Sequence, residues 1–200
     1  MARARRVHGP GPLHPDRVRC DRATHRRALV RAGTRVVVVL LIAGAALTID
    51  QLTKAWALSG LGPSRTIELA PGATLQLVFN PGVAFSLGSE MGPPLALGII
   101  ALTLCLATWA VVRAVRGTDM LATGLMSVAV GGAAGNLCDR ITRADSGPLT
   151  GEVVDFINID WFAIFNVADI FATLGIAGFA IRFLMPGSHK DEPAPTERSA

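Results

Sequence analysis

Four long runs of apolar residues divide this chain, and each is long enough to cross a lipid bilayer as a helix. They extend from about Arg35 to Leu58, Pro94 to Val112, Met120 to Cys138 and Phe162 to Met185. A helix needs about 20 apolar residues to cross a hydrocarbon core of roughly 30 Å. The third run is rich in glycine and alanine, which favour close packing between transmembrane helices. The pattern predicts a membrane all-α bundle of four transmembrane helices.

Basic residues indicate which ends of these helices face the cytoplasm. Ten arginines lie between Arg3 and Arg35, ahead of the first apolar run. Arg113 and Arg116 separate the second run from the third, and Arg182 lies near the end of the fourth. Because Lys and Arg collect in cytoplasmic segments, both termini are predicted to be cytoplasmic.

The two loops predicted to lie outside, 59–93 and 139–161, contain short β-prone segments. Thr66–Leu69 and Leu75–Phe79 are separated by a Pro-Gly turn signal, and Glu152–Ile157 is rich in β-branched residues. Such segments between turn residues are typical of strands. We therefore expect a small β element on the outer surface of the membrane.

Composition outside the apolar runs predicts the domain boundaries. Residues 1–33 are strongly basic and residues 187–200 are rich in Pro, Glu, Ser and Lys. Both are expected to be disordered and cytoplasmic, flanking one membrane domain at 34–186. The net charge is +4. Most of the arginines lie before the first apolar run, which indicates a cytoplasmic flank rather than a surface that binds nucleic acid. No nucleic-acid partner is expected.

The positions of histidine and cysteine argue against several kinds of catalysis. All four histidines lie in the terminal segments, and no HExxH sequence occurs. The three cysteines are widely spaced, without a CxxC pair. Ser-His catalysis, Cys-His catalysis and a zinc site are therefore not expected. No metal and no other cofactor is predicted.

Polar residues within and beside the apolar runs gather at the predicted outer ends. They come from separate segments of the chain: Asp50, Gln51, Lys54, Asn80, Asn136, Asp139, Arg140, Asp155, Asn166 and Asp169. The inner ends carry no comparable cluster. Ionisable residues in a membrane segment are costly and usually face a partner or a wet cavity. The pattern indicates a functional site at the outer interface.

Helical spacing pairs some of these polar residues. Asp50 and Lys54 are four residues apart with the acid first, which is a favourable order for an ion pair. Asp139 and Arg140 form a second potential pair. Both pairs are more simply explained as stabilising or orienting the bundle than as catalytic groups.

Asp155 and Asp169 have no cation nearby in the sequence once these pairs are made. Two carboxylates that share one proton can form a dyad, in which one activates water and the other protonates the substrate. The same acids would suit a small transporter coupled to protons or ions, although such a pathway needs polar residues that continue to the inner face. The residues alone leave a protease and a transporter open.

Short motifs that occur in chain order carry a resemblance to a known family. They are Asp50–Lys54 (DQLTK), Asn80–Ser86 (NPGVAFS), Gly131–Arg140 (GGAAGNLCDR), Val153–Phe156 (VVDF) and Phe165–Asp169 (FNVAD). Each motif alone is weak, but the whole set in this order is highly specific. Over about residues 35–185 the chain closely resembles bacterial lipoprotein signal peptidase, also called signal peptidase II.

This resemblance implies four transmembrane helices and an extracytoplasmic β-cradle, in the bacterial plasma membrane. It implies an aspartyl endopeptidase that removes signal peptides from prolipoproteins, cutting before the diacylglyceryl-modified cysteine at the extracytoplasmic face. The catalytic residues would be Asp155 and Asp169. The supporting residues, matched by motif, would be Asp50, Lys54, Asn80, Asn136, Asp139, Arg140 and Asn166. Expected partners are lipid-modified prolipoproteins and membrane lipids, and we expect a monomer.

Overall fold

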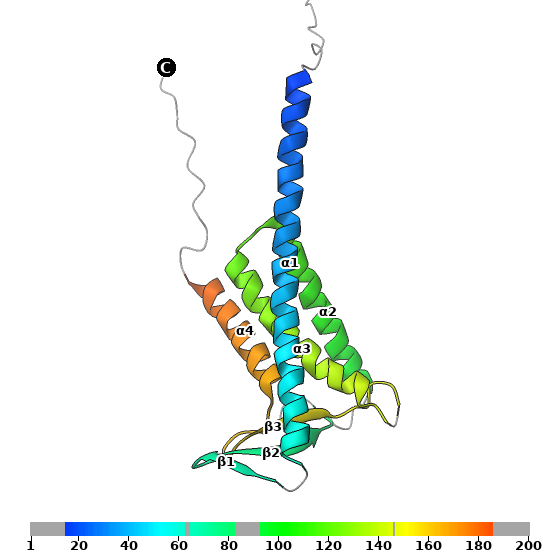
Figure 1. Ribbon diagram of the computed structural model, residues 1–200, viewed down its shortest axis with the longest axis vertical. Coiled ribbons are helices and arrows are strands. Elements are labelled where there is room, and N and C mark those ends of the chain that lie inside the picture. The colour runs from blue at the N-terminus through cyan, green and yellow to red at the C-terminus, as the bar shows by residue number, and fades with distance from the viewer. Residues whose placement is uncertain (1–14, 63–64, 83–92, 146, 186–200) are drawn as a thin grey trace, which may run out of the picture.

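The computed structural model describes residues 15–62, 65–82, 93–145 and 147–185. Within these ranges the helices are α1 (Pro15–Gly60), α2 (Pro93–Arg116), α3 (Met120–Thr142) and α4 (Val167–Leu184). Each is long and apolar enough to cross a membrane. Figure 1 shows them as a bundle with a small sheet at one end. The predicted membrane bundle with a small β element is therefore confirmed.

Helix α3 is the central helix of the bundle because its small residues let its neighbours approach closely. It packs against α1, α2 and α4. In its most apolar 18-residue segment 44% of the residues are buried, compared with 11% in the corresponding segments of α1 and α4. A Cβ added at Gly131 would collide with the Ala43 carbonyl oxygen of α1. A Cβ at Gly132 would collide with the Ala168 carbonyl oxygen of α4. The glycine-rich sequence of α3 is thus required for contact on two sides.

The sheet is antiparallel and caps the end of the bundle at which α1 finishes (Figure 1). Its strands, in spatial order, are β1 (Ile67–Ala70), β2 (Ala73–Asn80) and β3 (Val153–Ile159). Asp155 on β3 lies opposite Val78 on β2. Val154 and Phe156 of β3 pack with Ala57 and Leu61 from the end of α1. This small apolar core fixes the sheet on the helices.

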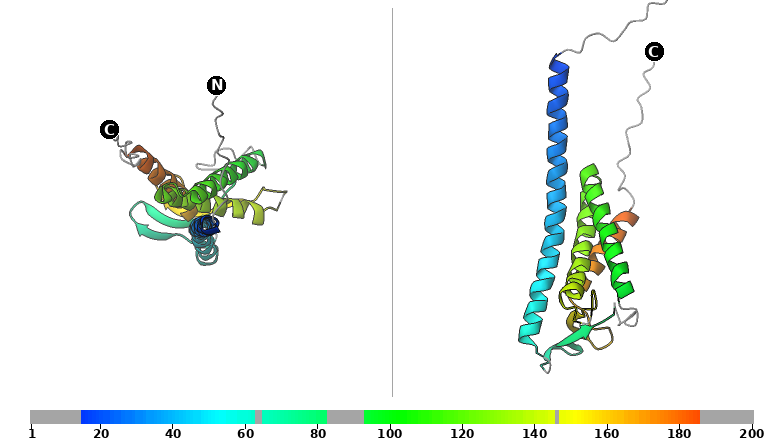
Figure 2. Two further views of the ribbon diagram at one scale, coloured as in Figure 1. Left: turned by 90° about the horizontal axis from the view of Figure 1, so that it is seen from above. Right: turned by 90° about the vertical axis from the view of Figure 1, so that its right-hand side faces the viewer.

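Helix α1 begins at Pro15, well before the domain boundary predicted at residue 34. The part of the basic extension from residue 15 onward is therefore helical rather than disordered. Arg, Ala and Leu are good helix formers, and they prolong a helix that the membrane span has already nucleated. In Figure 2, α1 extends past the other helices at the end away from the sheet. Residues 1–14 and 187–200, also predicted to be disordered, lie outside the described residues.

Helix α4 begins at Val167, later than the predicted start at Phe162. The reason is that the preceding residues pair with the sheet. The Phe165 backbone N–H donates to the Ile157 carbonyl oxygen at 3.0 Å, and the Ile157 N–H donates to the Phe165 carbonyl oxygen at 2.9 Å. Asn166 then caps the helix. Hydropathy alone does not distinguish this extended apolar segment from the first turn of a helix.

Candidate active site

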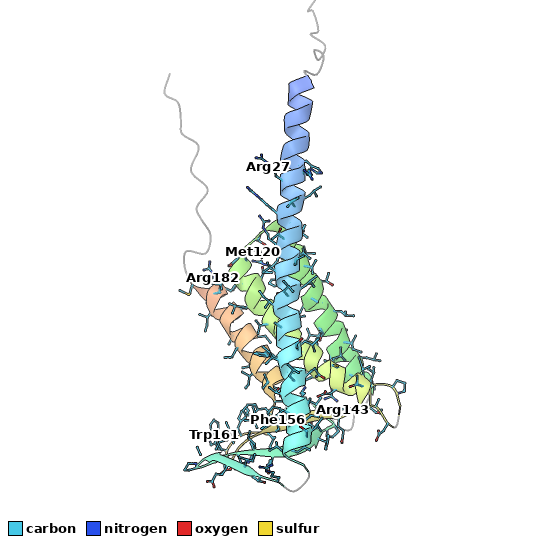
Figure 3. All side chains as sticks on the ribbon, viewed as in Figure 1. Arg27, Met120, Arg143, Phe156, Trp161 and Arg182 are labelled. Atoms are coloured by element: carbon cyan, nitrogen blue, oxygen red, sulfur yellow. The ribbon has the colours of Figure 1, made fainter. Side chains whose placement is uncertain are left out.

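Every residue predicted to belong to the site lies at the end of the bundle that carries the sheet, and hydrogen bonds or a shared cavity join them. Figure 3 labels Phe156, Trp161 and Arg143 at this end, with Met120 and Arg182 toward the other. The residues come from α1, α3, β2, β3 and the start of α4. The predicted gathering of polar groups from separate segments is therefore present.

Lys54 is the centre of a buried ion-pair network. Its Nζ lies 2.9 Å from Asp50 Oδ2 and 2.9 Å from Asp139 Oδ2, and the three side chains are at most 1% exposed. The predicted pair of Asp139 with Arg140 is wrong, because Asp139 instead contacts Lys54 and Arg143, with Arg143 Nε at 3.4 Å. Adjacent residues on a helix point about 100° apart, so their side chains rarely face each other.

Arg140 holds the turn that follows β2. Its guanidinium donates to the Pro81 carbonyl oxygen at 3.2 Å and also to the Gly82 carbonyl oxygen. The Gly82 backbone N–H donates to Asn80 Oδ1 at 2.9 Å. This contact turns the Asn80 amide nitrogen toward Asp155. The rest of the NPGVAFS motif, from residue 83 on, lies outside the described residues.

Asp155 lies within strand β3, as the β-prone run Glu152–Ile157 predicts, and its carboxylate is nearly fully buried. Oδ1 accepts from Asn166 Nδ2 at 2.6 Å, and Oδ2 accepts from Asn80 Nδ2 at 2.9 Å. Burial raises the pKa of Asp155 to about 6, and the charge of Asp169 adds to the rise against the opposing hydrogen bond from Asn80. The sheet register therefore fixes a carboxyl group that protonates far more readily than usual.

Asp169 is held by the first turn of α4. Asn166 and Asp169 form a capping box: the Asp169 N–H donates to Asn166 Oδ1 at 3.1 Å, and the Asn166 N–H donates to Asp169 Oδ2 at 3.2 Å. A carboxylate at this position is favoured by the helix dipole and by the unpaired N–H groups. Asn136 Nδ2 donates to Asp169 Oδ1 at 2.8 Å. Both oxygens of Asp169 are thus fixed.

A single side chain, Asn166, connects the two acids. Its Nδ2 donates to Asp155 Oδ1 and, at 3.0 Å, to Asn136 Oδ1, while its Oδ1 caps the helix that carries Asp169. A spacing of three residues would put Asn166 and Asp169 on one helix face if both were helical. The structure instead places Asn166 before the helix, where its side-chain amide donates to the Asp155 carboxylate and its backbone N–H donates to the Asp169 carboxylate.

Gln51 belongs to the network; it was in the predicted polar cluster but not among the supporting residues that the resemblance implies. Its Nε2 donates to the Gly135 carbonyl oxygen at 3.1 Å and to Asp139 Oδ1 at 3.4 Å. The backbone also contributes: the Ala168 N–H donates to Asp50 Oδ1 at 2.9 Å. The sequence signal was an amide residue inside an apolar helix, next to the acid of the DQLTK motif.

A cavity of about 510 Å³ connects the two acids with an apolar channel between helices. Its polar part is formed by Asn80, Asn136, Arg140, Asp155 and Asp169. Its apolar part is formed by residues that include Ile99, Phe162, Phe165, Ile170 and Leu174. Because Phe162 and Leu174 are 47% and 62% exposed, the cavity opens at the surface of the molecule. A cavity with one polar part and one apolar part suits an amphiphilic molecule.

The raised pKa of Asp155 predicts a pH-dependent cost to stability. Its pKa is about 6 in the folded protein and 3.8 ordinarily, so the folded state holds the proton more tightly than the unfolded state. The free energy of unfolding therefore falls as pH rises from about 4 to about 6, and the loss is on the order of 3 kcal/mol above that range.

Asp155→Asn cannot ionise, so it should be more stable than the wild type at about pH 7.5, with the gain disappearing near pH 4. Thermal unfolding in detergent micelles at the two pH values measures this difference. Hydrogen bonds altered by the amide contribute about equally at both pH values and cancel in the comparison. A gain of the same size at both values would contradict the expectation.

The chain is similar to known proteins over most of its length. A family model described as Signal peptidase (SPase) II matches residues 42–185. A lipoprotein signal peptidase from Bifidobacterium adolescentis is 48% identical over 164 residues, which cover 80% of this chain and 84% of the relative. A lipoprotein signal peptidase from Rhodococcus jostii is 37% identical over 147 residues, covering 73% of this chain and 68% of the relative.

Solved structures show the same fold. A bacterial membrane enzyme determined by the in meso method at 2.3 Å resolution has a TM-score of 0.59 and 24% identity, covering 84% of this chain and 94% of that one. A second, at 1.9 Å resolution, has a TM-score of 0.57 and 25% identity, covering 77% and 94%. With a family model that covers most of the chain and relatives of the same family, this protein belongs to the signal peptidase II family of membrane peptidases.

Proposed function

We propose that this protein is an aspartyl endopeptidase that removes signal peptides from prolipoproteins by cutting before the diacylglyceryl-modified cysteine. Membership of the family supports the class of reaction and substrate. The observation that carries the catalytic type is the pair Asp155 and Asp169, bridged by Asn166 and lining the polar end of an otherwise apolar cavity. Among the described residues that line the cavity, none is a histidine that could serve as an alternative base.

In the proposed reaction, one aspartate takes a proton from water as the water oxygen attacks the carbonyl carbon of the scissile bond. The other aspartate, protonated at the start, gives its proton to the carbonyl oxygen. The first aspartate then gives its proton to the leaving nitrogen. The second recovers a proton from the new hydroxyl as the C–N bond breaks, so the pair returns to its starting state.

The remaining polar residues support the pair in different ways. Asn80, Asn136 and Asn166 donate hydrogen bonds to the carboxylates. Arg140 orders the turn that positions Asn80. The remaining residues, Asp50, Lys54 and Asp139, form the buried network that joins α1 to α3.

The proposed topology places the active site at the extracytoplasmic face of the plasma membrane. The basic residues of α1, such as Arg27, and Arg182 of α4 lie toward the end away from the sheet (Figure 3), and basic residues favour the cytoplasmic side. Both termini are then cytoplasmic, with 34–186 as the membrane domain and a basic segment before it. The lipid-modified cysteine of a substrate would arrive at the outer leaflet, where the cavity lies open to lipid.

The decisive experiment uses two synthetic precursors of identical sequence, one with a diacylglyceryl group on the cysteine and one without. Purified protein should cleave the lipid-modified precursor directly before the cysteine, and cleave the other at least about a hundredfold more slowly. Mass spectrometry of the products locates the cut. Ion or proton flux across liposomes without any cleavage would instead identify a transporter and overturn the proposal.

The apolar part of the cavity is expected to bind the lipid chains. Thr173→Trp, which places a large side chain in the cavity wall, should raise KM for the lipid-modified precursor at least about tenfold, because the chains lose their volume. Steady-state kinetics in micelles measures this change. Ile176→Trp is the matched control: it lies on the same helix, is 51% exposed and does not line the cavity. An equal rise in both variants would contradict this role.

A further inference from the structure

Lys54 is a buried cation that takes no direct part in the proposed reaction. Besides its two carboxylate partners, its Nζ donates to Asn136 Oδ1 at 2.8 Å. Asn136 Nδ2 in turn donates to Asp169 Oδ1 at 2.8 Å. A single amide therefore lies between this cation and one of the two candidate catalytic carboxylates.

The direction of that amide is fixed by its neighbours. An ammonium group can only donate hydrogen bonds, so Asn136 must present its oxygen to Lys54. Asn166 Nδ2 donates to the same oxygen at 3.0 Å. The amide nitrogen of Asn136 is left to face Asp169, and Asp169 Oδ1 must accept. Its other oxygen accepts from a backbone N–H, so both oxygens of Asp169 face donors.

Asp155 also accepts two hydrogen bonds, and backbone N–H groups orient the amides of both donors. The Asn80 amide oxygen accepts from the Gly82 N–H, and the Asn166 amide oxygen accepts from the Asp169 N–H. Both amides are thus oriented by neutral backbone groups. A hydrogen bond from an amide that a charge polarises is stronger in a buried site than one from an unassisted amide. The two carboxylates therefore differ in what supports their ionised forms.

Other charges around the pair do not remove this difference. From α1, Asp50 faces Lys54, and from α3, Asp139 faces Lys54 and Arg143. Arg140 of α3 directs hydrogen bonds at two backbone carbonyl oxygens and acts on Asp155 only through space. Lys54 also acts on Asp155 through space, without a hydrogen-bonded amide between them.

We propose that Lys54 is a positioning residue that acts through Asn136 and makes the pair asymmetric, with Asp169 taking the proton from water and Asp155 giving its proton to the carbonyl oxygen. The proton balance is that of the reaction above, with each role now assigned. The raised pKa of Asp155 agrees with this assignment. The inference rests on the proposed aspartyl mechanism and goes beyond it.

The main test is the double variant Asp50→Asn/Lys54→Met. It removes one negative and one positive charge, so no new unpaired charge is left buried, and Asp139 keeps Arg143. We expect kcat for the lipid-modified precursor to fall about 30-fold or more, with KM changed less than about threefold. We also expect the acid limb of the kcat profile to move at least about half a pH unit upward, because the pair takes up its second proton more readily without the cation.

A second variant, Asn136→Leu, leaves the ion pairs of Lys54 intact and removes the amide. It should reproduce the loss of kcat and the shift of the acid limb. The triple variant that combines the three changes should be no slower than Asn136→Leu alone, because Lys54 acts through that amide. A purely structural role would give additive losses and an unmoved pH profile. If the double variant does not fold, Asn136→Leu decides by the same pH shift.

The matched control removes an ion pair far from the site, Arg182 Nε to Asp119 Oδ2 at 3.3 Å, toward the end away from the sheet (Figure 3). Asp119→Asn/Arg182→Met should keep the wild-type kcat and pH profile. The inference is overturned if Asp50→Asn/Lys54→Met and Asn136→Leu both keep kcat within about threefold of the wild type and the same profile. Cleavage by Asp155→Asn or Asp169→Asn would instead refute the proposed function, whatever Lys54 does.

Discussion

Asp155→Asn and Asp169→Asn should each lower kcat for a lipid-modified precursor by at least about a thousandfold. Each change replaces a group that exchanges protons with an amide of the same shape that cannot. At position 155 the amide oxygen can still accept one of the hydrogen bonds from Asn80 and Asn166. At position 169 it can still accept from the Asn166 N–H and cap α4. The chemistry is therefore removed with little change in the fold, and single-turnover cleavage in micelles measures the loss.

The matched control for this pair is Asp160→Asn, which changes an exposed acid just after β3. Asp160 does not line the cavity, so its variant should cleave at the wild-type rate. Circular dichroism and thermal unfolding verify that all three variants are folded. Cleavage by either buried variant at more than about a tenth of the wild-type rate would show that its carboxylate is not part of the reaction.

Gly132→Ala and Gly175→Ala should each destabilise the protein by about 1–3 kcal/mol, and both should lower activity. A Cβ at Gly175 would lie 2.6 Å from the Leu125 carbonyl oxygen and 2.7 Å from the Ala129 backbone nitrogen. A Cβ at Gly132 would press on the backbone of α4. Neither contact can be relieved by a side-chain rotation, so α3 and α4 must separate. Activity falls with stability because these two helices carry Asn136 and Asp169.

The sign of this effect is decided by two opposing contributions. Alanine favours a helix over glycine by about 1 kcal/mol, so only a clash of larger cost gives net destabilisation. Gly44→Ala and Gly98→Ala isolate the favourable contribution, because a Cβ at either position has nothing within 4 Å. Thermal unfolding should show these two variants at or above the wild-type stability. If all four variants behave alike, close helix contact is not what the glycines provide.

Local patterns predicted most of the fold correctly. The four helices follow from apolar runs long enough to cross a membrane, and the strands follow from β-branched segments around a Pro-Gly turn. Both signals are contained within a few neighbouring residues. The start of α4 was wrong because Phe165 forms backbone hydrogen bonds with β3, and that pairing depends on a strand elsewhere in the chain. Helix α1 begins before the predicted membrane span because a long helix continues into a polar sequence without a break.

The gathering of these polar residues at one end of the bundle could be predicted from the sequence, but their contacts with one another could not. Polar residues at the outer ends of the predicted helices had to meet somewhere, because burying them alone in a membrane is costly. Which of them pair depends on how the helices rotate against one another. Asp139 therefore contacts Lys54, which is distant in the sequence, rather than the neighbouring Arg140. The double contact of Asn166 likewise needs the strand and helix to be placed together.

The carboxylate of Asp169 has two roles, and both use the lone pairs of its oxygens. It accepts the Asn166 N–H to close the first turn of α4, and in the proposed reaction it also receives a proton from water. Once protonated, it accepts that hydrogen bond more weakly, and the helix start loosens. Protonation of Asp169 and fraying of the first turn of α4 are therefore coupled. Since Asp169 gives this proton to the leaving nitrogen, the first turn of α4 would be loosest while the tetrahedral intermediate exists and would close again as the C–N bond breaks.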